Sequence, residues 1–362
     1  MDSEAAPRRP GGRLVSFAYS SEAWRTGAIV VGLVTCYGLY AAALSLFLHF
    51  DLPPLTEWLA VLGRYVAAVF LFYGVRLFYG IARHRPESPF SYARARALEW
   101  RLPERFISVI PVLIALGAFL GFFGAAKSSI GMVNTYTADP MLAVIDARLH
   151  SGDAWRLIQP LLGYPVVSHA INIGYHLWAG VLMVMTIFTV AYIDRPRLRL
   201  QYLITFLLCW IVMGTVLATA IPSVGPCYYE YFYGDARFRP LMEYLRQANQ
   251  LVSLPALDVQ NQLLDWYKAG EHGRGRGISA MPSMHVSMAC LFALFGWRIS
   301  RFWGVAATIF LAVILIGSVH LGYHYAIDGY VSLLLTPLLW WGSGKIAHFA
   351  LATSADAQAA DA

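Results

Sequence analysis

Two histidines and one aspartate stand at the edges of apolar stretches near the end of the sequence. His285 ends the segment 279–285 (SAMPSMH), and His324 and Asp328 lie in 320–330 (HLGYHYAIDGY). If the second segment is helical, residues four apart share one face, so the Asp328 carboxylate can accept the Nδ1–H of His324. That bond would fix the tautomer, leave Nε2 as a nucleophile and stabilise the cation formed on attack.

A histidine of this kind can carry a phosphoryl group as phosphohistidine. The reaction also needs a group that protonates the leaving oxygen, and His285 is the predicted acid. Packing at the membrane boundary is the alternative role for these side chains. Ionisable residues at such depth are usually functional, which favours a phosphoryl-transfer site.

Phosphoryl transfer further requires donors for the equatorial oxygens. Backbone N–H groups at the start of the helix near 284 can supply them. The predicted phosphate- or substrate-binding side chains are Lys127, Ser283, Arg274, Arg276 and His320. Lys127, the two arginines and His320 have plainer alternatives. Lys127 can be a lysine that extends to the membrane boundary, and the arginines can be charges on an exposed loop. For His320 the favoured role is at a helix end.

The composition determines where such a site can lie. Of the 362 residues, 58% are hydrophobic and only 13% are charged, against about 25% charged in soluble domains. We therefore predict an all-α integral membrane protein, and the net charge of +6 reflects topology rather than nucleic-acid binding. The four cysteines show no metal or disulfide spacing. The eight predicted spans are about 26–50, 57–81, 106–126, 165–193, 202–221, 284–297, 303–320 and 325–349.

Arginines cluster in the short segments 8–13, 83–105, 195–199 and 298–301. Such segments are typical of the cytoplasmic side, so we expect both termini inside and the two histidine segments at the outer face. Residues 139–150 predict a short helix on that face. Asp139 and Pro140 would form its cap and first turn, and Met141, Leu142 and Leu149 recur at helical spacing. It can cover the bundle or act as a lid.

The segments Pro282-Ser-Met-His285 and His324-Tyr-Ala-Ile-Asp328 resemble the second and third motifs of the type 2 phosphatidic acid phosphatase superfamily. Its members are membrane phosphatases and phosphotransferases built on a six-helix core. The resemblance implies His324 as nucleophile, Asp328 as its orienting group and His285 as acid and base, with no metal or cofactor.

The chain also departs from the phosphatase pattern. Gly317 and Ser318 occupy the positions of the usual Ser-Arg pair, and the first motif, a lysine followed by a distant Arg-Pro, is absent in that form. These departures resemble the inositol phosphorylceramide synthase-like (inositolphosphotransferase) branch. So do the segments 127–130, 138–140, 145–149 and 222–229.

That resemblance implies transfer of a phospho-headgroup from a phospholipid donor to a lipid hydroxyl. A phosphatase using water is the alternative, and a non-catalytic lipid-binding or transport protein is the remote one. The expected domains are 1–105 (tail, two added spans and basic loop), 106–349 (catalytic membrane domain) and 350–362 (disordered tail). Abundant Arg and Ala favour a bacterial inner membrane with a periplasmic site over a Golgi membrane with a luminal one.

Overall fold

The computed structural model describes residues 12–52, 54–100, 102–192, 195–271 and 276–352, and within these ranges it is helical without any strand. The long helices are α1 (Gly12–Leu48), α2 (Leu55–His84), α4 (Leu102–Ser128), α8 (Pro165–Ile187), α9 (Pro196–Leu208), α14 (Met284–Ile299), α15 (Arg301–His320) and α16 (Ala326–Ala350). The shorter ones are α3 (Pro89–Glu99), α5 (Ile130–Val133), α6 (Asp139–His150), α7 (Ala154–Leu162), α10 (Ala218–Ala220), α11 (Tyr229–Tyr233), α12 (Arg239–Leu251) and α13 (Pro255–Lys268). Two π-helical stretches, η1 (Phe188–Tyr192) and η2 (Cys209–Leu217), and a 3₁₀ turn, η3 (Pro226–Tyr228), complete the set.

The predicted all-helical membrane architecture is confirmed. Six stretches of the described chain are long and apolar enough to cross a bilayer, and they match the first five predicted spans and the seventh. The sixth predicted span, α14, has only 16 residues, and α16 is not among the six. The predicted count of eight is therefore approximate.

Helix α14 is short because protein surrounds it. Ten of its residues are buried, and it packs along both α15 and α16. A helix that is apolar on all sides belongs in a core. Phe292 and Phe295 of α14 join Phe119 of α4 and Phe206 of α9 in the main hydrophobic cluster. This cluster fixes the position of the first turn of α14, which carries His285.

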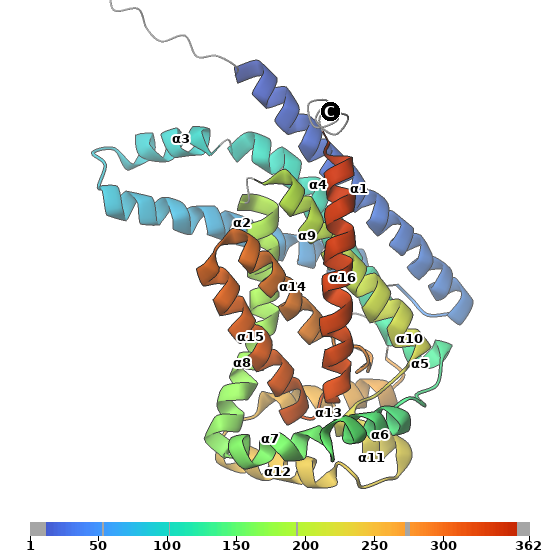
Figure 1. Cartoon of the computed structure of the whole chain (residues 1–362). Helices are drawn as coiled ribbons and strands as arrows, with labels where there is room; N and C mark the ends of the chain where they lie inside the picture. The colour runs from blue at the N-terminus through green and yellow to red at the C-terminus, as the bar shows by residue number, and fades with distance from the viewer. Residues whose placement is uncertain (1–11, 53, 101, 193–194, 272–275, 353–362) are drawn as a thin grey trace, which may run out of the picture.

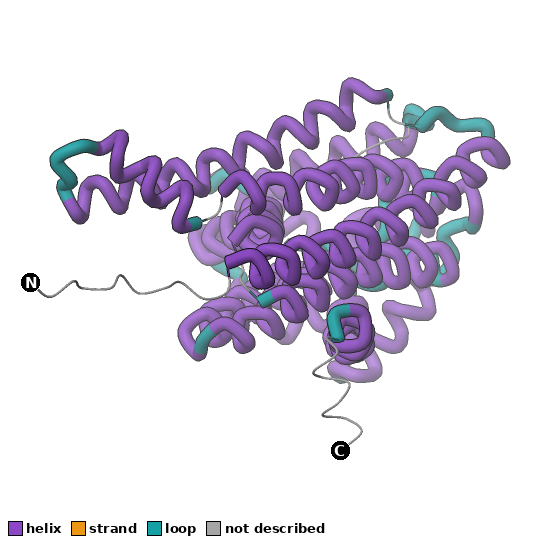
Figure 2. Tube along the Cα trace, turned by 90° about the horizontal axis from the view of Figure 1, so that it is seen from above, coloured by secondary structure: helices purple, strands orange, loops and turns teal. Residues whose placement is uncertain are grey.

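The two ends of the bundle differ. The described start of α1 and the end of α16 lie at one end, whereas α6, α7, α11, α12 and α13 lie across the other (Figure 1). The α2–α3 hairpin projects from the bundle in both views (Figures 1 and 2). The turn between α15 and α16, which carries His324, is at the end covered by the short helices.

Helix α6 has the predicted bounds, but its faces differ from the expected pattern. Leu142 is buried, whereas Met141 and Leu149 are 53% and 60% exposed. The inward face instead carries two carboxylates, Asp139 and Asp146, which are 0% and 4% exposed. The prediction of Asp139 as the cap was wrong: Ala138 is the N-cap residue, and no side chain caps this helix. The Asp139 carboxylate is occupied elsewhere.

Candidate active site

His324 and Asp328 meet at the start of α16. The ring Nδ1 of His324 lies 3.3 Å from Oδ2 of Asp328, and the side chains are 6% and 0% exposed. His324 precedes the helix rather than sharing its face, because α16 begins only at Ala326. The contact forms because Asp328, in the first turn, reaches back to the backbone N–H of Tyr325 at 3.1 Å as part of a capping box. A carboxylate held in this way can orient the imidazole.

His285 lies in the first turn of α14, and α8 holds its ring. The ring stacks on Tyr175 with centroids 4.6 Å apart and lies 4.3 Å from the Trp178 ring. The indole N–H of Trp178 also donates to the His285 carbonyl at 3.1 Å. The ring centroids of His285 and His324 are 6.2 Å apart, so two different helices bring these residues together.

Backbone and hydroxyl contacts fix α14 against α16. The Ser283 N–H donates to the Asp328 carbonyl at 3.2 Å, and the Ser332 hydroxyl donates to the Ser283 carbonyl at 2.9 Å. One turn further along, the hydroxyls of Ser287 and Thr336 are 2.9 Å apart. The position of His285 relative to the start of α16, just after His324, is therefore set by packed helices.

A cavity of about 580 Å³ opens in front of both histidines. One end is polar, with Lys127, Ser279, His285 and His324, and the rest is mostly apolar. The apolar part is lined by Leu120, Phe123, Trp178, Ala179, Trp210, Gly214, Val259, Leu263 and Met284, among others. Lys127 is the only lysine or arginine among the described residues that line it. Such a cavity suits a molecule with an anionic head and an apolar tail.

Of the other predicted phosphate-binding residues, the described ones, Ser283, Arg276 and His320, do not line the cavity. The Ser283 hydroxyl is fully buried and caps α14 by accepting the Val286 N–H at 3.4 Å. His320 is fully buried, with Nε2 2.8 Å from the Ser168 hydroxyl. His320 is thus packed within the protein and does not line the cavity.

Gly277 of the Gly/Arg loop lines the cavity, whereas Arg276, the described arginine of this loop, does not. Arg276 forms an ion pair with Glu271 at 3.0 Å and lies over the Trp266 ring. Arg274 lies outside the described residues. Gly277, which follows Arg276, has φ +86°. A Cβ there would stand 2.7 Å from the Cα of Ser128, so this part of the loop rests directly on the end of α4.

Asp139 of α6 is the best-satisfied buried carboxylate of the site region, and sequence reasoning missed its role. Its oxygens accept hydrogen bonds from the Ser223 hydroxyl (2.8 Å), the Val224 N–H (2.9 Å), the Gly225 N–H (2.8 Å), the Tyr233 hydroxyl (2.9 Å) and the Tyr325 hydroxyl (3.0 Å). Burial and the nearby Asp139 charge raise the pKa of Tyr325 well above its usual value, so the phenol stays protonated and donates. Asp139 thereby holds the residue that follows His324.

The second α6 carboxylate acts on the same turn. Oδ1 of Asp146 accepts the Ile327 N–H at 3.0 Å, which satisfies a free donor at the start of α16. Burial raises the pKa of Asp146. The sequence signal for this pair was their separation of seven residues, which places both on one face of a helix.

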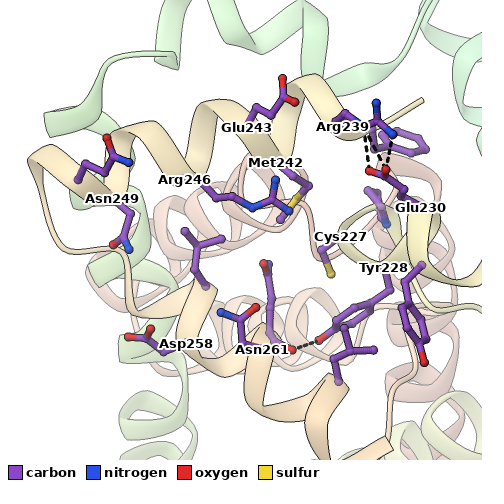
Figure 3. A pocket seen from close by; sticks show the side chains of 17 residues that line it. Cys227, Tyr228, Glu230, Arg239, Met242, Glu243, Arg246, Asn249, Asp258 and Asn261 are labelled. Carbon is purple, nitrogen blue, oxygen red and sulfur yellow. Dashed lines mark hydrogen bonds and ion pairs between the residues drawn. The ribbon is translucent and has the colours of Figure 1, made fainter. Parts of the chain in front are cut away.

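A second, more polar hollow lies between α11, α12 and α13, and Figure 3 shows it from close by. Its volume is about 730 Å³, and its rim includes Arg246 and the Glu230–Arg239 ion pair. Tyr228 lines both this hollow and the histidine cavity, and its hydroxyl donates to the Gln260 carbonyl at 2.9 Å. The η3 turn is thus part of a wall between the two spaces.

With this geometry in place, the comparison with known families is specific. A family model described as the PAP2 superfamily matches residues 140–341, more than half of the chain, and the chain belongs to that superfamily. The superfamily includes phosphatases and phosphotransferases. The matched range contains His285, His324 and Asp328. It begins at residue 140 and therefore excludes Lys127 and Asp139. Searches of curated proteins and of solved structures found no match.

Proposed function

We propose that the protein is a membrane lipid phosphotransferase that works through a phosphohistidine on His324. The observation that supports this most directly is the His324–Asp328 contact facing His285 in a cavity with one polar end. In the first step, Nε2 of His324 attacks the donor phosphorus. The N–P bond forms, the bond to the leaving oxygen breaks, and His285 gives that oxygen its proton.

The second step reverses the roles. His285 takes the proton of an acceptor hydroxyl, the acceptor oxygen attacks phosphorus, and the N–P bond breaks. Lys127 would neutralise the equatorial phosphate oxygens, and the Asp328 charge would stabilise the cationic ring. The buried side chains around the reacting groups limit the access of water, which favours a lipid hydroxyl as acceptor.

The finer assignment, transfer of an inositol phosphate-like headgroup, is supported by the resemblance to the inositol phosphorylceramide synthase-like branch. Ser318 stands in place of the third-motif arginine, and its hydroxyl donates to the Leu315 carbonyl at 2.8 Å. The same histidines would serve a lipid phosphate or polyprenyl diphosphate phosphatase, which is the second candidate. For the location we propose a bacterial inner membrane, with the site at the periplasmic face and both termini in the cytoplasm.

Product analysis with purified protein in detergent tests the proposal. Phosphatidic acid, polyprenyl diphosphate and phosphatidylinositol are supplied separately, with and without ceramide or diacylglycerol. We expect a new phospholipid only when donor and acceptor are both present, and none from His324→Ala. Free phosphate from the first two donors without an acceptor, lost in His324→Ala, would instead establish a phosphatase. A lipid-related function that persists in His324→Ala would favour a non-catalytic binding protein.

A further inference from the structure

A third histidine lines the cavity on its membrane-facing side. His176 lies in α8, eleven residues after the helix begins at Pro165, or about 16 Å along its axis at 1.5 Å per residue. Its side chain is exposed on the bundle surface and also borders the cavity, as does Ala179 three residues later. The cavity therefore reaches the side of a membrane-spanning helix at this point.

The hydrogen bonding of His176 fixes its tautomer. The ring Nδ1 lies 2.8 Å from the Asn172 carbonyl oxygen, one turn earlier in α8. A carbonyl oxygen only accepts, so Nδ1 carries the proton and Nε2 of the neutral ring is an acceptor. No described residue is recorded as a partner of Nε2. Nε2 can therefore accept a hydrogen bond from a ligand that has an O–H or N–H group.

The surroundings of His176 indicate what kind of ligand this is. The same cavity has an apolar wall that includes Leu120 of α4 and Val259 and Leu263 of α13. A polar ring facing an apolar wall within a span is costly unless it serves a function. The neighbours of His176 in α8, Tyr175 and Trp178, hold the ring of His285. A lipid beside His176 is therefore close to the residue that would activate its hydroxyl.

We propose that His176 marks the subsite for the acceptor lipid and determines which lipid is accepted. The lipid chains would lie along the apolar wall, the reacting hydroxyl would reach His285 and phosphorylated His324, and Nε2 of His176 would accept a hydrogen bond from a second donor group. The ligand class is a lipid that carries a hydroxyl or amide N–H beside its reacting hydroxyl. A ceramide has such a group and a diacylglycerol has none. This inference rests on the proposed transferase function.

Separate measurement of the two half-reactions tests it. Purified protein in liposomes receives phosphatidylinositol labelled at phosphorus, with ceramide or diacylglycerol as acceptor. Rapid quenching measures phosphoenzyme formation, and lipid extraction measures transfer. The variants are His176→Leu, which removes the acceptor nitrogen, and His176→Gln, which keeps an acceptor oxygen. Leu177→Ala is the matched control, because Leu177 is exposed on the same helix and does not line the cavity.

We expect His176→Leu to form phosphoenzyme within about twofold of wild type and to transfer to ceramide roughly 3- to 20-fold more slowly, the loss expected for one hydrogen bond in a membrane protein. His176→Gln should recover part of this, and transfer to diacylglycerol should change little. Unchanged ceramide transfer, or an equal fall in phosphoenzyme formation, would overturn the acceptor subsite.

A different outcome separates this inference from the proposed function. If wild-type protein forms no phosphoenzyme, the proposed function fails, and the subsite is judged by binding alone. A photoreactive ceramide should then label α8 in wild type and lose that label in His176→Leu. Labelling that persists in the variant would overturn the subsite as well.

Discussion

The Asp328→Asn variant tests how the carboxylate acts on His324. The ring Nδ1 of His324 and the backbone N–H of Tyr325 both meet the same carboxylate oxygen, Oδ2. The other oxygen, Oδ1, is buried and has no hydrogen-bond partner among the described residues. An asparagine can therefore keep its carbonyl oxygen at the Oδ2 position and place its amide nitrogen where Oδ1 stands.

This geometry predicts that Asp328→Asn preserves the tautomer of His324 and loses only the negative charge. A hydrogen bond to a charged group contributes about 1.5–3 kcal/mol and a neutral one about 1 kcal/mol. The difference of about 0.5–2 kcal/mol corresponds to roughly 2- to 30-fold slower phosphoenzyme formation. Asp328→Ala should lose orientation as well, and loss of tautomer control over a catalytic histidine costs about 10⁴-fold.

The assay is rapid-quench formation of the acid-labile phosphoenzyme from labelled phosphatidic acid. Asp265→Asn, an exposed carboxylate of α13, is the matched control and should behave as wild type. If Asp328→Asn is as damaging as Asp328→Ala, the contact of both donors with one oxygen is wrong. If Asp328→Asn keeps the full rate, the charge of the carboxylate plays no part in the reaction.

Three further changes have defined expected outcomes. Lys127→Met should lower kcat/KM for a lipid phosphate by roughly 10- to 150-fold, because a charged hydrogen bond is lost. Steady-state kinetics measure this change, and a change of less than twofold would show that Lys127 does not bind the phosphate. Asp139→Ala leaves two buried N–H groups without an acceptor and should cost roughly 2–6 kcal/mol of stability, seen as a lower thermal unfolding midpoint in detergent. An unchanged midpoint would contradict the network described above. Gly225→Ala should reduce activity, because φ is +87° and the new Cβ would stand 2.4 Å from the Tyr323 carbonyl oxygen. A variant with wild-type kinetics would show that this turn can move freely.

Much of the fold could be predicted from apolar stretches and arginine positions. The start of α8 at Pro165 and the end of α15 at His320 agree with the predicted spans. The pairing of His324 with Asp328 was also expected, because side chains four residues apart lie close together when the segment is helical. The sequence could not show that a capping box, rather than a shared helix face, brings the two together.

The parts of the site that depend on distant segments were not predictable. The partners of Asp139 lie 84 to 186 residues away in the chain, so a single sequence carries no signal for them. Trp178 and Tyr175 look like ordinary membrane aromatics, and only the packing of α8 against α14 shows that they hold His285. Ser283 stands beside a catalytic motif, yet its hydroxyl serves the helix start.

The two inward carboxylates of α6 have a consequence for how the protein is assembled in the membrane. Asp139 and Asp146 are synthesised before their partners at 223–225, 233 and 325–327, although His150 and Ala154 also lie beside Asp146. A buried carboxylate without partners is costly, so α6 gains its full set of contacts only after the start of α16 has been inserted. We therefore expect α6 to dock late in biogenesis. A chain that stops before the last span would leave both carboxylates short of partners, a defect that membrane quality control can recognise.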